Sequence, residues 1–348
     1  MGRMPERVPG RLPGSPPTLA DVAERAGVSR QTVSNAVNNA ELLRPDTLER
    51  VRAAIAELGY LPNRAARNLR TRSSHLLGLR ISPHLEGTAE ATMDRFVHSL
   101  VEASRGAGYH VLLFDAVDRT DPLAGYDDLL RATAVDAFVV TDTYLGNPQA
   151  GLLDERGAPF VAFGRPWDDP GAPHPWVDVD GAAGTRLATE HLLDRGHERI
   201  AWIGWRKDST IGEDRRSGWS SGLRDRGLPT TGLASRVEDT VASGRGASAV
   251  LLDEARPTAF VCASDTLAVG VLHTLADRGL VAGRDVAVVG FDDSQAAQLV
   301  LPGLTSVRQP LEQVAVEVVR ALEGVMTHQP RPEPGLLLTP TLSVRGSS

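Results

Sequence analysis

Apolar positions begin to recur at helical spacing directly after Thr18. Asp21 follows three residues later, and at this spacing each of the two side chains can bond the other residue's backbone N–H at the start of a helix. One helical face then collects Leu19, Val22, Ala23 and Ala26. Gly27 ends the repeat, since glycine readily takes the left-handed conformation that closes a helix. The pattern predicts a short amphipathic helix between Thr18 and Gly27.

Two further helices are predicted before residue 60. Ser29 is a suitable N-cap residue, and Val28 can pack on Val33 across the first turn. The buried face of this second helix consists of Val33, Ala36 and Val37, and that of the third helix of Leu48, Val51, Ile55 and Leu58. Two short helices joined by a tight turn that contains glycine form a helix-turn-helix, and the third would complete a small all-α core.

From His75 onward, apolar runs of strand length alternate with helical patterns. Helices are expected at about 90–105 and 181–195. Strands are expected at 76–81, 109–115, 137–141, 160–164, 199–204, 259–263, 286–291 and 336–344. Such alternation predicts parallel α/β sheets. About 270 residues in this pattern favour two lobes over a single sheet.

The exposed face of the second helix is rich in side chains that both donate and accept hydrogen bonds. It carries Arg30, Gln31, Ser34, Asn35 and Asn38. A helix face that is only solvated more often carries Glu and Lys. Side chains of the kind seen here can read the edges of DNA bases in the major groove. The second helix is therefore a candidate recognition helix.

The distribution of charge supports a DNA-binding N-terminal region. Residues 1–72 hold 12 Lys and Arg against 7 Asp and Glu, which is a net charge of +5. Because the whole chain carries −7, the remaining residues carry −12. A small basic domain on a large acidic body can meet phosphates with the basic domain alone. The alternative is a basic tail without a partner.

Composition narrows the class of protein further. No apolar run approaches the roughly 20 residues that a membrane-spanning helix needs. Residues 1–17 are rich in Pro, Gly and Arg and lack the apolar stretch of a signal peptide, so we expect a disordered tail and a cytoplasmic protein. Cys262 is the only cysteine, which excludes an intrachain disulfide and a cysteine-cluster metal site.

The N-terminal sequence resembles the headpiece of the LacI/GalR repressor family. The resemblance rests on residues 19–29, 32–34, 58–63 and 66–70 in this order and spacing. Two departures stand out. Asn35 occupies a position where many members have Arg, which bears on the preferred base. Leu43 and Arg44 replace the usual Val-Ser before the third helix, which is expected to affect only a helix cap.

The resemblance implies a hinge helix from Pro62 to Leu69 that folds on DNA, too short to be stable alone. Leu69 would be an apolar wedge in the minor groove, and Arg64 and Arg67 would face phosphates. A plain linker is the alternative. The DNA-binding residues expected from the pattern and the resemblance together are Thr18, Leu19, Ser29, Arg30, Gln31, Thr32, Ser34, Asn35, Asn38, Tyr60, Arg64, Arg67 and Leu69.

Polar residues follow several predicted strands, and ligands of α/β folds bind beyond the carboxyl ends of strands. The family resemblance extends here: residues 196–201, Arg215 before Gly218-Trp219, 263–265 and 289–293 match its regulatory core, which resembles two-lobed periplasmic sugar-binding proteins. It implies that Arg215, Asp265 and Asp292 contact an effector; Ser264 stands where Asn is usual. The expected effector residues are His84, Asp142, Arg165, Trp205, Arg215, Asp265 and Asp292.

The sequence also points to the kind of effector. Residues 163–167 and 174–180 look like those of actinobacterial regulators that respond to cello-oligosaccharides or related glucosides. We therefore expect a repressor of carbohydrate-utilisation genes that a small sugar releases from DNA. A non-sugar effector, or a corepressor that promotes DNA binding, is the alternative within the family. A sugar-binding protein without a regulatory role is the alternative outside it.

An enzyme is not expected. No P-loop, G-x-G-x-x-G, G-x-S-x-G or H-E-x-x-H motif occurs in a suitable context. His191 and His197 lie six residues apart, on a helix and its following turn, and are interpreted as structural. Cys262 lies in an apolar strand and is interpreted as a core residue. We expect no cofactor and no metal.

The expected organisation has four parts: a tail (1–17), a helix-turn-helix domain (18–61), a hinge helix and linker (62–73), and a two-lobed effector-binding and dimerisation domain (74–348). The expected partners are a palindromic double-stranded DNA operator, a small-molecule effector and a second copy of the chain, because two-fold symmetry doubles the base contacts that one headpiece can make. No membrane partner is expected.

Overall fold

A computed structural model describes residues 17–60, 73–81, 88–115, 123–141, 143–169, 171–329 and 335–348. The chain divides into two compact units, with the boundary between Ser73 and Ser74. The N-terminal unit is called the headpiece and the C-terminal unit the core. Each unit is described by itself.

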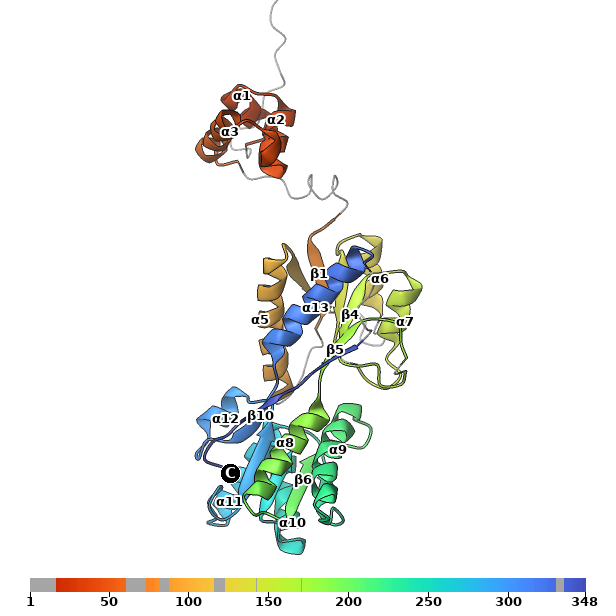
Figure 1. Cartoon of the computed structure of the whole chain (residues 1–348), viewed down its shortest axis with the longest axis vertical. Coiled ribbons are helices and arrows are strands. Elements are labelled where there is room, and N and C mark those ends of the chain that lie inside the picture. Colours follow the sequence, from red (N-terminus) through yellow and green to blue (C-terminus); the bar gives the residue numbers. More distant parts are fainter. Residues whose placement is uncertain are drawn as a thin grey trace, which may run out of the picture. The chain divides into compact units, whose positions relative to one another are not determined.

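The headpiece is built from three helices, α1 (Leu19–Ala26), α2 (Arg30–Asn38) and α3 (Pro45–Leu58) (Figure 1). The predicted capping box is present: the Thr18 amide donates to the Asp21 carboxylate at 2.7 Å, and the Asp21 amide donates to the Thr18 hydroxyl at 3.4 Å. Gly27 has φ 64°, in the left-handed region that ends α1. The predicted helix and both of its ends are confirmed.

The second and third helices follow the predicted pattern with one addition. The Ser29 hydroxyl caps α2 by accepting from the Thr32 amide at 3.1 Å. A short 3-10 helix, η1 (Ala40–Leu42), separates α2 from α3 and was not predicted. Arg44 is the N-cap residue of α3 and makes no side-chain cap hydrogen bond, so the departure at residues 43–44 does remove a cap. Pro45 at the first helical position suits this start, because its missing N–H would be unpaired there anyway.

The headpiece helices pack around one small core. Its buried members are Val22, Ala23, Ala26, Val33, Val51, Ala54 and Tyr60. Each of the three helices contributes at least one side chain, so the amphipathic faces read from the sequence meet as expected. Of the described side chains of α2, Val33 is buried in this core, and Arg30 and Gln31 are exposed.

The first lobe of the core, the N lobe, is a six-stranded parallel sheet. Its strand order is β11-β5-β4-β3-β1-β2. The strands are β1 (Leu76–Arg80), β2 (His110–Phe114), β3 (Ala137–Val140), β4 (Phe160–Phe163), β5 (Trp176–Val179) and β11 (Gly335–Leu338). Its helices are α5 (Thr88–Gly106), α6 (Ala124–Arg131), α7 (Pro148–Glu155) and α13 (Leu311–Met326).

Alternation along β3 shows that helices cover both faces of this sheet. Ala137 and Val139 pack in one cluster with Phe96 of α5 and Val318 of α13. Phe138 and Val140 pack in another with Tyr126 of α6 and Leu153 of α7. Successive side chains of a strand point to opposite faces, so the sheet is buried on both sides, as parallel sheets generally are.

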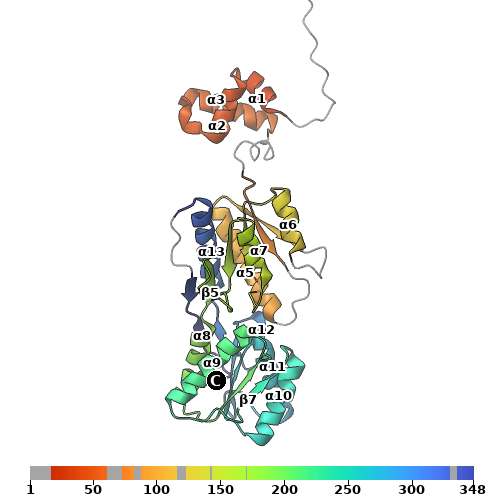
Figure 2. The ribbon, with the colours of Figure 1, turned by 90° about the vertical axis from the view of Figure 1, so that its right-hand side faces the viewer.

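The second lobe, the C lobe, is a six-stranded sheet of order β12-β10-β9-β8-β6-β7. The strands are β6 (Ile200–Gly204), β7 (Ala234–Arg236), β8 (Ala259–Cys262), β9 (Ala287–Phe291), β10 (Thr305–Arg308) and β12 (Thr341–Ser343). The helices are α8 (Gly181–Asp194), α9 (Thr210–Asp225), α10 (Val241–Glu254), α11 (Asp265–Asp277) and α12 (Gln295–Leu299). Figure 2 shows α8 and α9 on one side of this sheet and α10 and α11 on the other.

The chain crosses between the lobes three times, from β5 to α8, from β10 to α13 and from β11 to β12. The last crossing corrects the single strand expected at 336–344. That segment is two strands in different sheets, separated by Thr339 and Pro340, because proline cannot donate to a sheet ladder. The strand β12 runs antiparallel to β10, so the C-lobe sheet is mixed rather than purely parallel.

Sequence reasoning also missed β5, β7 and β10. These strands have only three or four residues, and β7 and β10 contain polar side chains. The two-lobed α/β architecture is nevertheless confirmed. Within the described ranges, no helix combines the length and the apolar character needed to cross a membrane.

Candidate functional site

The first candidate site is the exposed face of α2. Val33 is fully buried and fixes the helix against the headpiece core. Arg30 and Gln31, in the first turn, are exposed. The Gln31 side-chain amide donates to the Asn35 side-chain oxygen at 3.0 Å, one turn further along. The polar face is therefore presented on a rigid support, and two of its members already act as a pair.

The other residues expected at the DNA interface are held in different ways. Thr18 is engaged in the capping box, and the Thr32 hydroxyl is hydrogen-bonded to the Ser29 hydroxyl at 2.8 Å. Leu19 packs against the headpiece core, and Tyr60 belongs to that core with 8% exposure. Leu19 and Tyr60 thus contribute packing in this structure.

Ser34 and Asn35 of the same helix are half-buried. The remaining expected DNA contacts lie outside the described residues. They are the side chain of Asn38 and the residues Arg64, Arg67 and Leu69 of the expected hinge. Their roles stay predictions.

The second candidate site is a cavity of about 210 Å³ in the core, lined from both lobes. The lining includes residues just beyond the carboxyl ends of β4, β6 and β9, where the fold predicts a ligand. The N lobe supplies Thr92, Met93, Thr141, Thr143, Phe163, Gly164, Trp167, Asp178 and Val179; the C lobe and the connecting segments supply Gly181, Trp205, Ile211, Asp214, Arg215, Phe291, Asp292 and Gln309.

Arg215 and Asp292 are buried charged groups on the wall of this cavity. Arg215 lies on α9 with 7% exposure. Its guanidinium lies 3.6 Å from the centroid of the Phe291 ring and 4.9 Å from that of Trp205. It donates to the Ala263 carbonyl at 2.6 Å and lies 3.6 Å from an Asp292 carboxylate oxygen. Its Nε is buried and has no hydrogen-bond partner among the described residues. A buried donor without a partner is uncommon in proteins and calls for an explanation, such as a functional role.

Asp292 opposes Arg215 from a strained loop after β9. Asp292 and Asp293 have φ of 106° and 48°, conformations that non-glycine residues rarely adopt and that concentrate at functional sites. The Gln309 side-chain amide donates to the Asp292 carboxylate at 2.7 Å. The carboxylate is thus oriented toward the cavity by a partner of its own.

Asp265 does not line the cavity. It is fully buried behind it, at the first position of α11. Its carboxylate accepts from the Ser294 amide at 2.7 Å, the Ser294 hydroxyl at 2.8 Å and the Ser306 hydroxyl at 2.6 Å. Burial, with the nearby Asp292 charge, raises the pKa of Asp265 to about 7. The structure places Asp265 as the support of the loop that carries Asp292.

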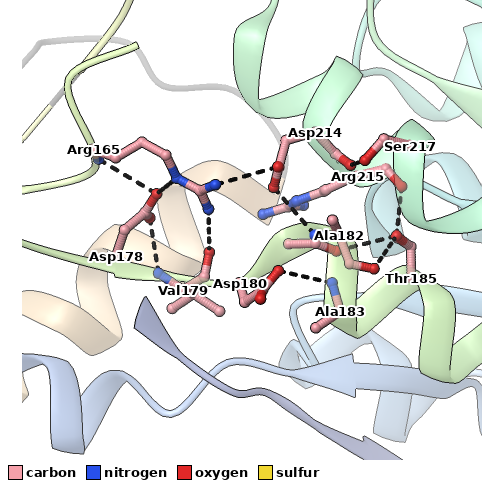
Figure 3. A network of polar contacts seen from close by, with 11 residues as sticks. Arg165, Asp178, Val179, Asp180, Ala182, Ala183, Thr185, Asp214, Arg215 and Ser217 are labelled. Atoms are coloured by element: carbon pink, nitrogen blue, oxygen red, sulfur yellow. Dashed lines mark hydrogen bonds and ion pairs between the residues drawn. The ribbon is translucent and has the colours of Figure 1, made fainter. Parts of the chain in front are cut away.

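Arg165 likewise lies beside the cavity and not on its lining. Its side chain donates to Asp178 at 2.7 Å, to Asp214 at 3.3 Å and to the Val179 carbonyl at 3.2 Å (Figure 3). Gly164, just before it, has φ 121°, and a Cβ there would collide with the Thr143 side chain. Only glycine allows the chain to turn here. Of the other expected effector residues, Trp205, Arg215 and Asp292 line the cavity, whereas His84 and Asp142 lie outside the described residues.

Sequence reasoning missed several cavity residues. Trp167 and Asp178 lie in the segments 163–167 and 174–180, which indicated only the kind of effector. Asp214 is the residue before Arg215. Asp239, after β7, accepts a hydrogen bond from the Ser264 hydroxyl, and burial raises the pKa of Asp239. The hydroxyl at the position where the family usually has Asn is therefore already bonded within the protein. Among the described residues, no three His, Cys, Asp or Glu side chains are grouped as a metal site would require.

Two protein-family models match this chain. The family of bacterial regulatory proteins called lacI matches residues 18–63, and the periplasmic binding protein-like domain matches residues 189–348. The chain is 36% identical to the HTH-type transcriptional regulator CelR of Thermobifida fusca over 338 residues, which cover 95% of this chain and 98% of that protein.

Solved structures agree. A CelR–cellobiose complex is 33% identical, with a TM-score of 0.71 over 95% of this chain and 100% of that one. A lac repressor dimer bound to operator and the anti-inducer ONPF is 29% identical, with a TM-score of 0.79 over 96% of this chain and 99% of that one.

Proposed function

This chain belongs to the lacI family of bacterial regulatory proteins, and we propose that it represses carbohydrate-utilisation genes until a small neutral sugar enters its core and releases it from DNA. Family membership makes the chain a DNA-binding transcription regulator and not an enzyme. The operator, the effector and the direction of its effect are the parts that we propose here. We also propose that the protein acts in the cytoplasm.

The proposal for DNA rests on the exposed polar face of α2. Arg30 and Gln31 are placed in the first turn, which is the part of a recognition helix that enters the major groove. A paired contact from either side chain to a base edge contributes about 1–3 kcal/mol of discrimination. One headpiece reads few base pairs, so we propose a homodimer on a palindromic operator, as in the lac repressor dimer bound to its operator.

We propose these domain limits: 18–61 for the DNA-binding domain, 62–73 for the hinge and 74–348 for the effector-binding and dimerisation domain. Within the hinge, Leu69 is proposed to insert between base pairs of the minor groove, with Arg64 and Arg67 on phosphates.

The proposal for a sugar rests on one observation above all: the buried Arg215 guanidinium lies against the Trp205 and Phe291 rings at the wall of the cavity. Its Nε is buried and bonded to none of the described residues, so a small shift of the side chain toward the cavity would offer this donor to a ligand hydroxyl. Guanidinium and carboxylate groups bind pairs of hydroxyls, and aromatic rings pack on the C–H face of a pyranose. Trp167 of the N lobe and Trp205 of the C lobe supply one such ring from each lobe.

The charge of the cavity favours a neutral ligand. Asp178, Asp214 and Asp292 line it, against the Arg215 guanidinium on the lining and that of Arg165 beside it. Three carboxylates facing two guanidinium groups would repel an anion. We therefore propose a neutral saccharide over a sugar phosphate. Because the CelR relative is known as a cellobiose complex, cello-oligosaccharides are the first class to test.

The test is direct binding followed by DNA release. Calorimetric titration of the whole protein with cellobiose, cellotriose, maltose and glucose 6-phosphate should give heat of binding for a neutral sugar and none for the phosphate. An operator selected from genomic fragments then reports the sign of the response. Tighter binding of the phosphate ester would contradict the charge argument, and stronger operator binding with sugar would make the ligand a corepressor.

A further inference from the structure

Two arginines of the N lobe reach polar groups of the C lobe across the described part of the core. Arg95 of α5 donates to the Asp292 backbone carbonyl at 3.2 Å. Arg165, after β4, donates to the Asp214 carboxylate of α9 at 3.3 Å. Both acceptors belong to residues that line the ligand cavity. The contact of Arg165 is the one that joins two charged side chains.

The Arg165 guanidinium is held by several groups of the protein. Each of its three nitrogen atoms donates, to Asp178, to Asp214 and to the Val179 carbonyl. One face of the guanidinium lies 4.6 Å from the centroid of the Trp167 ring. Its side chain is 19% exposed, and those of Asp178 and Asp214 are 15% exposed. Three of the five N–H groups of the guanidinium are thus bonded to the protein and one of its faces lies on a ring, so Arg165 is placed to fix the positions of these neighbours.

Asp214 connects this group to the segment where the chain passes from one lobe to the other. It lies on α9 in the C lobe, and its second carboxylate oxygen accepts from the Ala182 amide at 3.1 Å. Ala182 is in the first turn of α8, directly after the chain has crossed from β5. Figure 3 shows Asp214 between Arg165 and the start of α8. The Asp178 contact stays within the N lobe, so opening the lobes breaks only the Arg165–Asp214 contact of this group.

We propose that Arg165 is a positioning residue that latches the two lobes through Asp214 and sets Asp178, Asp214 and Trp167 as ligand-facing groups without itself contacting the ligand. This replaces the expectation that Arg165 binds the effector directly. A ligand that needs both lobes binds more tightly when the closed arrangement is already populated. The latch therefore sets the apparent affinity for the effector. The ligand part of this inference rests on the proposed function; the latch itself does not.

The latch is tested first without ligand, by acrylamide quenching of tryptophan fluorescence in the full chain. Of the five tryptophans, Trp167 and Trp205 line the cavity, Trp202 and Trp219 are buried, and Trp176 is half-buried on β5. Arg165→Gln and Asp214→Asn should each raise the quenching constant, about twofold, because the cavity rings become accessible. The double variant should be no worse than either single variant, since both remove one contact.

A matched control is Asp225→Asn, at the end of the same helix α9. Asp225 pairs with Arg186 at 2.7 Å, and both partners belong to the C lobe. This variant should quench like the wild type. If Asp214→Asn also quenches like the wild type while melting at the same temperature, the latch does not exist. If Asp214→Asn melts at a lower temperature, the Arg165→Lys variant, which keeps the charge, decides the question. Its quenching constant should lie between those of the wild type and Arg165→Gln.

The positioning role is tested next with cellobiose as the probe. Loss of a hydrogen bond between charged groups weakens binding by roughly ten- to hundredfold. Arg165→Gln should show such a loss, and in the Asp214→Asn background the same change should cost clearly less, because only the support of Asp178 and Trp167 is then left to lose. Losses that multiply in full would mean that Arg165 acts on the sugar independently of Asp214. If the wild type binds no saccharide at all, the proposed effector is wrong, and the quenching result still decides the latch.

Discussion

Helix α2 of the headpiece and the cavity of the core both carry polar side chains that are candidates for function, but they hold them in opposite ways. On α2 they come from nine consecutive residues, and Arg30 and Gln31 are exposed. In the core they come from strand ends and helices far apart in the chain, and Arg215 and Asp292 are buried. Changes on α2 should therefore alter partner choice at little cost in stability, whereas changes in the cavity should alter binding and folding together.

The largest expected effect is that of salt concentration on operator binding. Salt should weaken DNA binding by the headpiece and leave ligand binding in the core almost unchanged. Arg30, and with it Arg64, Arg67, Arg70 and their dimer mates, are expected to neutralise several phosphates. Each phosphate contact releases about 0.9 counterion, so raising salt from about 50 to 200 mM should weaken operator binding about a thousandfold. Fluorescence anisotropy at graded salt measures this. Ligand binding in the enclosed cavity should change little over the same range. A flat response of operator binding would mean that the basic headpiece is not the DNA contact.

The next effect is loss of the ligand response in Arg215→Ala. Removing this guanidinium leaves the buried Asp292 carboxylate without the cation that now lies 3.6 Å away, and it removes a charged hydrogen-bond donor from a residue that lines the cavity. Loss of a hydrogen bond from a charged donor to the ligand costs about 1.5–3 kcal/mol, so the effector affinity should fall roughly ten- to hundredfold. Titration of the ligand into the operator complex measures the response. Operator affinity without ligand should stay within about twofold of the wild type.

The matched control for that variant is Arg226→Ala. Arg226, just after the same helix, is exposed and pairs with Asp194 on the surface at 3.1 Å. An exposed pair contributes little, so this variant should keep the wild-type response. Equal losses in both variants would mean that the response depends on α9 as a whole and not on Arg215. A normal response in Arg215→Ala would remove the assignment of the effector site.

A smaller effect, in stability, should come from Asp265. Its pKa is raised to about 7 by burial, from an ordinary value of 3.8. A raised pKa means that the native state keeps its proton longer than the unfolded chain does. The contribution of Asp265 to the free energy of unfolding is therefore full below about pH 4. It is lost as pH rises through about 7, by at most about 1.4 kcal/mol per pH unit.

Denaturant unfolding of the wild type and Asp265→Asn at several pH values tests this. The free energy of unfolding of the wild type should fall relative to that of Asp265→Asn as pH rises from about 4 to 7, because the amide does not titrate. The headpiece offers no buried carboxylate of this kind among its described residues. A difference that is independent of pH would show that Asp265 is ionised throughout, held by its three hydrogen-bond donors.

How much could be predicted from the sequence also differs between the two regions. The headpiece helices and their caps followed from local spacing, because a capping box or a left-handed glycine involves residues three or four positions apart. The 3-10 helix at Ala40–Leu42 was missed, since it has no apolar periodicity. The two-lobed core followed from alternation, but β11 and β12 were merged, because which sheet each strand joins depends on the fold as a whole.

The candidate cavity could be predicted only in part. The resemblance singled out Arg215 and Asp292, and the strand-end argument added Trp205; all three line the cavity. Asp265 and Arg165 were also expected there but lie behind or beside it, because sequence gives a residue's place on a strand end and not the partners that surround it. Trp167 and Asp214 were missed for the same reason: the crossing of the chain between the lobes brings them together.

The smallest effect should come from the Gln31–Asn35 pair, and it tests whether polar side chains of α2 can be changed without cost to the fold. The two side chains are hydrogen-bonded at 3.0 Å. Gln31→Ala and Asn35→Ala should each change the discrimination between bases by about 1–3 kcal/mol, and both should do so at the same operator position. Their effects should not add, because Asn35 orients the Gln31 amide. Thermal unfolding should shift by about 1–2 °C at most, since neither side chain belongs to the headpiece core.

Selection of operators from a randomised pool measures the base preference of each variant of this pair. The matched control is Glu49→Ala, at an exposed position of α3, which should leave both preference and stability unchanged because Glu49 lies on neither the polar face of α2 nor the headpiece core. If Gln31→Ala and Asn35→Ala select different base positions, each side chain reads DNA independently. If they unfold earlier than the control by more than about 5 °C, a shift that corresponds to about 1 kcal/mol in a domain of this size, the face of α2 is structural. The contrast between an adaptable reading surface and a cavity coupled to folding would then fail.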